Sequence, residues 1–177
     1  NITELTNTIR DNQHISHKLY ALKAKIMGVK KIDYTDMAIT LSTKKQTFSF
    51  PDAAELVYQS FYEIDPAYGN LFKQFVDNGH IDVYPATGKT GVMYCWGGHM
   101  RPTYILLNWT DDLRSVRTLA HEMGHAIHSE YSKVQNVFHE QYSIACAEIA
   151  STLFENFVFE KLLDKLSEKL TEEFGRG

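Results

Sequence analysis

The sequence predicts a mainly α-helical fold of the α+β class, with a small antiparallel β-sheet. Long stretches without glycine or proline carry apolar residues at spacings of three to six, which favours amphipathic helices. Two short apolar segments between glycines, 92–96 and 103–109, indicate an antiparallel hairpin. With 177 residues and 44% hydrophobic content, the chain is long enough to form one domain with a buried core.

The helices can be predicted in order along the chain. Residues 2–27 should form one helix that ends at Gly28, because glycine readily adopts the left-handed conformation that follows a helix. Residues 36–50 are β-branched and partly alternating, so they indicate a turn or strand region. A second helix is expected to begin at Pro51, and a third to cover residues 66–78.

Charge and hydropathy exclude several classes of partner. The chain has 18 basic and 22 acidic residues and a net charge of -4, which argues against binding to nucleic acid or to an anionic membrane. No apolar run approaches the roughly 20 residues that span a bilayer, and the amino terminus lacks the pattern of a signal peptide. We therefore expect a soluble, cytoplasmic location.

The two cysteines, Cys95 and Cys146, are too few for a disulfide framework or a thiolate zinc cluster. Cys95 lies in a predicted strand and Cys146 in a predicted helix. Both are expected to pack as small buried hydrophobic residues.

The motif His-Glu-Met-Gly-His occupies residues 121–125, within a predicted helix that Thr110 or Asp111 could cap. Two histidines four residues apart project from one face of a helix, so both can reach a single metal ion. The glutamate between them can take a proton from water at that metal. The opposite face is apolar and is expected to pack against the core; it carries Val116, Leu119, Ala120, Met123 and Ile127.

This spacing predicts a zinc site of the peptidase type, with His121 and His125 as metal ligands and Glu122 as the general base. The alternative is that both histidines are ordinary side chains of an amphipathic helix. A catalytic zinc usually takes three protein ligands, so a third must be found. Histidine at 128 and tyrosine at 131 exclude the extended metzincin pattern, and His128 lies about 10 Å further along the helix axis, too far to share the ion.

A glutamate from a second helix is the remaining option for the third ligand, and Glu130, Glu140, Glu148 and Glu155 are the candidates. The first is still on the motif helix, and the second falls in the connecting stretch. Glu148 is best placed, because the small residues of segment 144–151 would let two helices approach closely. A single acid in an apolar run is costly to bury unless it is paired or bound to metal; the alternative is a solvated position.

Several segments in order resemble the thimet oligopeptidase and oligoendopeptidase F family of zinc metallopeptidases, most closely its oligoendopeptidase F branch. These segments are His121–His128, Ala147–Ser151 with Glu155, Gly79–Tyr84 and Thr103–Asn108. The resemblance implies one zinc ion per chain, held by His121, His125 and Glu148, with Glu122 as the general base. Glu155, one heptad after Glu148, is either a carboxylate that orients a ligand histidine or a surface glutamate.

Members of this family are several times longer, and they place a histidine and tyrosines downstream to stabilise the oxyanion. This chain begins at Asn1 and stops at Gly177, so we expect a single zincin-like catalytic domain over residues 1–177, a fragment of a longer, mostly helical peptidase. The family's closed channel implies short peptide substrates. The hairpin that leads into the motif helix is a candidate platform for an extended substrate backbone.

The sequence therefore predicts a zinc metalloendopeptidase that hydrolyses peptide bonds in short oligopeptides. One alternative is a zinc-containing peptide-binding or structural domain without turnover, because the downstream oxyanion residues are missing. Another is a zinc hydrolase that acts on substrates other than peptides.

Overall fold

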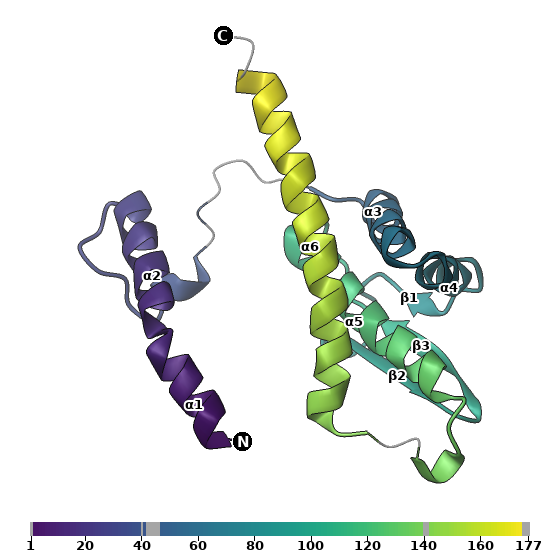
Figure 1. The fold of residues 1–177 in the computed structure, drawn as a ribbon. Coiled ribbons are helices and arrows are strands. Elements are labelled where there is room, and N and C mark those ends of the chain that lie inside the picture. The colour runs from purple at the N-terminus through teal and green to yellow at the C-terminus, as the bar shows by residue number, and fades with distance from the viewer. Residues whose placement is uncertain (1, 40, 42–46, 140–141, 175–177) are drawn as a thin grey trace. The chain divides into compact units, whose positions relative to one another are not determined.

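The computed structural model describes residues 2–39, 41, 47–139 and 142–174 (Figure 1). The chain divides into two compact units, Asn1–Lys45 and Gln46–Gly177. The single zincin-like domain expected over residues 1–177 stays a prediction. None of the described helices is both long and apolar enough to cross a membrane.

The first unit contains helix α1 (Ile2–Asp11), helix α2 (Gln13–Met27) and a 3-10 turn, η1 (Asp36–Ala38). The expected helix over 2–27 is thus present but is interrupted at Asn12. At this break, the Thr8 carbonyl oxygen accepts from the side-chain amide of Asn12 at 2.8 Å as well as from its backbone N–H at 3.1 Å. Helix α2 ends as predicted, with Gly28 in the left-handed region at φ 70°.

The predicted turn or strand region at 36–50 contains no strand among its described residues, which form η1, irregular segments and the first residue of a helix, Phe50. Residues 40 and 42–46 of this region lie outside the described residues.

The described part of the second unit contains the helices α3 (Phe50–Ile64), α4 (Pro66–Asp77), α5 (Leu113–Ser132) and α6 (Ile144–Phe174), with a short 3-10 turn η2 (Val137–His139). The helices expected to begin near Pro51 and Pro66 are confirmed. Each has a proline in its first turn and a side-chain cap, from Ser49 and Asp65 respectively. Their apolar faces meet α5 and α6 in one core, whose fully buried side chains include Phe61, Phe72, Leu119, Met123 and Val158.

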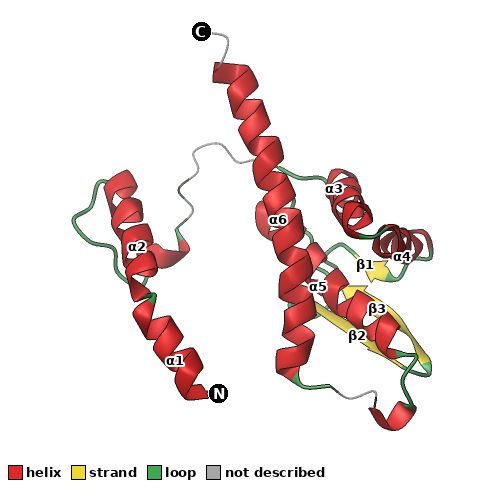
Figure 2. Ribbon diagram, viewed as in Figure 1, coloured by secondary structure: helices red, strands yellow, loops and turns green. Residues whose placement is uncertain are grey.

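A three-stranded sheet lies against α5 (Figure 2). It consists of β1 (Ile81–Asp82), β2 (Tyr94–Gly98) and β3 (Arg101–Leu106), in the order β1-β3-β2. The predicted hairpin is confirmed as the antiparallel pair β2–β3. The expectation of a purely antiparallel sheet is wrong, because β1 pairs with β3 in parallel.

The reason for the mixed sheet is the path of the chain. After β1 the chain passes to the far edge, and the hairpin then returns β3 to the middle, beside β1 and in the same direction. Strand β3 has both edges paired. The free edge of the hairpin therefore belongs to β2.

Helix α5 is capped by Asp112, not by Thr110 or Asp111. The Asp112 Oδ1 atom accepts hydrogen bonds from the Ser115 backbone N–H at 2.8 Å and from its hydroxyl at 2.9 Å. Asp111 lies one residue before the cap position, and its carboxylate accepts from the Trp109 indole N–H at 2.9 Å. Sequence alone could not rank three neighbouring residues that can each cap a helix, since the residue at which the helix begins decides which one caps it.

Replacing Asp112 with alanine should lower the free energy of unfolding by about 0.5–2 kcal/mol, because two first-turn donors lose their acceptor. Urea denaturation followed by circular dichroism would measure this. The matched control is Asp77→Ala, which removes only an exposed ion pair with Lys73 and should change stability by less than about 1 kcal/mol. Equal losses in the two variants would contradict the capping assignment.

Candidate metal centre

Helices α5 and α6 lie side by side (Figure 1), and Gly124 of α5 packs against the backbone of α6. A Cβ atom built on Gly124 would lie 2.7 Å from the Ser151 Cα atom and 3.0 Å from the Ala150 carbonyl oxygen, both backbone atoms of α6. The glycine of the motif and the small residues of α6 thus permit a close approach. This approach brings Glu148 to the histidine face of α5.

Three side chains from the two helices present donor atoms to one point. The Glu148 Oε2 atom lies 3.4 Å from His121 Nε2 and 3.8 Å from His125 Nε2. One ligand atom from each of the three residues falls within 4.8 Å of the others. Four-coordinate zinc, with bonds of about 2.0–2.2 Å to nitrogen and oxygen, separates its donors by about 3.3–3.6 Å. The 3.4 Å and 3.8 Å distances are near this range and the 4.8 Å bound exceeds it, so the group suits a metal ion in its donor chemistry and approaches the spacing that one needs.

Among the described candidates for a third ligand, neither Glu130 nor Glu155 belongs to the donor group. Glu130 forms an ion pair with Lys133, at 2.6 Å, and Glu140 lies outside the described residues. The ring of His128 stacks on Tyr142 with centroids 4.2 Å apart, and His128 is not in the donor group. His128 therefore lies near His125 without belonging to the donor group. The ligand roles of His121, His125 and Glu148 stay predictions.

Two further contacts orient the donor group. The His121 Nδ1 atom is 3.0 Å from Glu155 Oε2, so the Nε2 atom of the same ring is the one near Glu148. The Ser151 hydroxyl donates to Glu148 Oε2 at 2.8 Å and is fully buried. Our sequence reasoning missed Ser151, although its position three residues after Glu148 on a helix is a signal for such a contact.

Glu122 lies under strand β2. Its side chain is buried, with a residue exposure of 7%, and its carboxylate accepts a hydrogen bond from the backbone N–H of Cys95. Burial raises the pKa of Glu122, while the neighbouring His121 and the Cys95 N–H partly oppose that shift. Glu122, the predicted general base, is thus held between helix α5 and strand β2 by the hydrogen bond from Cys95.

Burial lowers the pKa of His125, and the nearby His121 lowers it further. A low pKa keeps the imidazole neutral, which is the form that binds a metal.

Burial raises the pKa of the Cys95 thiol to about 12, with Glu122 adding to the shift. Cys95 is therefore a protonated, part-buried side chain. Cys146 is exposed, so the prediction that it packs as a buried residue is wrong; it lies in the first turn of α6.

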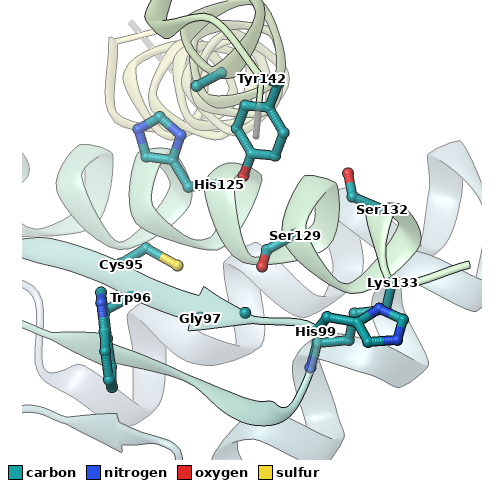
Figure 3. A pocket seen from close by; sticks show the side chains of 11 residues that line it. Cys95, Trp96, Gly97, His99, His125, Ser129, Ser132, Lys133 and Tyr142 are labelled. Carbon is teal, nitrogen blue, oxygen red and sulfur yellow. The ribbon is translucent and has the colours of Figure 1, made fainter. Parts of the chain in front are cut away.

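A pocket of about 390 Å³ adjoins the donor group (Figure 3). Its walls are strand β2, the second half of α5 and the beginning of α6, and His125 belongs to its lining. Gly97 on β2 has no room for a side chain, since a Cβ atom there would lie 2.4 Å from Thr103 Oγ1 and 2.8 Å from Ser129 Oγ. The strand can therefore lie close to α5, and the pocket runs from the donor group along β2.

Proteins that resemble this chain in sequence and in structure are named as peptidases. The chain belongs to peptidase family M3, because the model of that family matches residues 5–174. The family consists of metallopeptidases, in agreement with the His-His-Glu group.

Two curated relatives and one solved structure illustrate the similarity. Oligopeptidase PepF of Bacillus subtilis is 28% identical over 167 residues, covering 93% of this chain and 25% of that protein. An oligoendopeptidase F homolog of Borreliella burgdorferi is 35% identical over 170 residues, covering 91% and 28% respectively. The crystal structure of a candidate peptidase from Chlamydophila abortus superposes with a TM-score of 0.78 at 31% identity, covering 92% of this chain and 28% of that one. The mainly helical fold is confirmed. The chain spans about a quarter of the length of the curated relatives.

Proposed function

We propose that this chain is the catalytic core of a zinc metalloendopeptidase that hydrolyses peptide bonds in short oligopeptides. His121, His125 and Glu148 would hold the zinc ion. A zinc ion bound there would supply a Lewis acid and lower the pKa of water. The observation that carries the proposal is the convergence of these three donors from two helices, beside a buried glutamate.

Glu122 would act as the general base and later as the general acid. It takes a proton from the attacking water and then delivers it to the leaving amine. Two features support this assignment: its position next to His121 in the motif, and the hydrogen bond from the Cys95 N–H that holds the carboxylate in place. Membership of family M3 supports the reaction class.

Strand β2 would orient the substrate. Its free edge borders the pocket that reaches His125, so an extended peptide can add to the sheet through backbone hydrogen bonds. Such binding tolerates many side chains. It agrees with substrates that are short peptides, as the names oligopeptidase and oligoendopeptidase of the relatives indicate for those proteins.

Metal analysis of paired variants tests the proposal. Purified protein should contain one zinc ion per chain by elemental analysis, and Glu148→Gln should lose it under dialysis that the wild type survives. The matched control is Glu130→Gln, which changes the same functional group on α5 outside the donor group and should keep the metal. Zinc retained in Glu148→Gln, or lost equally in both variants, would contradict the ligand assignment.

Cleavage of a quenched fluorescent peptide tests the reaction. Chelation should abolish cleavage and zinc should restore it. Peptide binding without cleavage by the zinc-loaded protein would instead support a non-catalytic binding domain.

A further inference from the structure

Arg117 on α5 contacts Glu155 on α6, and Glu155 in turn contacts His121 of the donor group. It lies one helical turn before His121 on α5. Its Nε atom donates to Glu155 Oε1 at 2.8 Å, and its Nη2 atom contacts the same oxygen. The other carboxylate oxygen of Glu155, Oε2, is 3.0 Å from His121 Nδ1. A continuous chain of contacts thus runs from Arg117 through Glu155 to His121.

Burial and ring packing restrict the Glu155 end of this chain of contacts, and the Arg117 side chain is 50% exposed. The Glu155 side chain is only 17% exposed, and the guanidinium group of Arg117 lies over the Phe159 ring, 5.2 Å from its centroid. Because the two guanidinium nitrogens occupy Oε1, Oε2 is left to accept a hydrogen bond from the imidazole. A proton on Nδ1 leaves the Nε2 lone pair free, and that atom faces Glu148.

We propose that Arg117 is a positioning residue of the metal centre. It acts through Glu155 to hold His121 in the tautomer and ring orientation that a metal requires, so it increases the affinity of the centre for zinc. This proposal rests on the proposed function, since it assumes that His121 is a metal ligand. Neither the motif nor the sequence resemblance singles out Arg117.

A purely structural ion pair between helices offers a contrast within the same protein. Lys161 on α6 pairs with Glu63 on α3, and the Lys161 side chain is 19% exposed. This pair also ties α6 to the core, but it does not contact the donor group. Removing it should affect stability alone.

The experiment compares Arg117→Met with Lys161→Met. Methionine keeps the aliphatic stem but removes the hydrogen-bond donors. The zinc dissociation constant, measured by competition with a chromophoric chelator, should rise by up to about 10-fold in Arg117→Met, the lower end of the loss that follows when the direct partner of a ligand histidine is removed. It should be unchanged in Lys161→Met. The visible spectrum of the cobalt-loaded protein should shift only in Arg117→Met.

Arg117→Lys provides a second, milder variant, because lysine keeps the charge but not the two-nitrogen contact. It should recover part of the lost affinity. Melting temperatures of the metal-free proteins separate folding defects from metal effects. Wild-type zinc affinity in Arg117→Met, or the same loss in Lys161→Met, would overturn the proposal. Failure of the proposed function would be seen separately, as wild-type protein that binds no zinc.

Discussion

Glu122→Gln is expected to lower kcat by about 10²- to 10⁴-fold while the protein keeps its zinc. Glutamine has nearly the same size and can still accept the hydrogen bond from the Cys95 N–H, so the packing under strand β2 should survive. It cannot take a proton from water. The loss should therefore appear in turnover and not in metal content.

The measurement is steady-state cleavage of a quenched fluorescent peptide, with zinc content determined on the same samples. Glu130→Gln again serves as the control, because it makes the same chemical change on the same helix and should leave kcat near the wild-type value. Wild-type turnover in Glu122→Gln would reject the role of general base. A variant that loses turnover only because it loses zinc would reject it as well.

Gly124→Ala should weaken both the fold and the metal centre, although alanine favours helices over glycine by up to about 1 kcal/mol. The new Cβ atom would lie 2.7 Å from a backbone atom of α6 and 3.2 Å from Phe154 Cβ. A backbone cannot turn away as a flexible side chain can. Overpacking of this kind typically costs about 1–3 kcal/mol, and it should push α6 with Glu148 away from the histidines.

Gly91→Ala is the matched control, because a Cβ atom there has no neighbour within 4 Å and its backbone is not left-handed. Urea denaturation and chelator competition for zinc should both report a loss for Gly124→Ala and little change for Gly91→Ala. Unchanged stability and unchanged zinc affinity in Gly124→Ala would show that the helix contact does not control the position of Glu148.

Local patterns predicted most of the elements correctly. Helices near Pro51 and Pro66, the end of α2 at Gly28 and the β2–β3 hairpin all depend on neighbouring residues, whose conformational preferences act within one or two turns. The failures were of another kind. The break at Asn12, the cap at Asp112 and the parallel β1–β3 pair depend on competition between local bonds or on pairing across the fold.

The sequence by itself determined that His121 and His125 share one face, because helical geometry places residues four positions apart on neighbouring turns, with Glu122 next to His121. It also favoured Glu148 over Glu130 as the third donor. Only the tertiary structure decided that Glu148 meets the histidines, that Glu155 reaches His121, and that Arg117 holds Glu155. The physical reason is distance along the chain: these contacts join α5 to α6, and they depend on how closely two separate helices can pack.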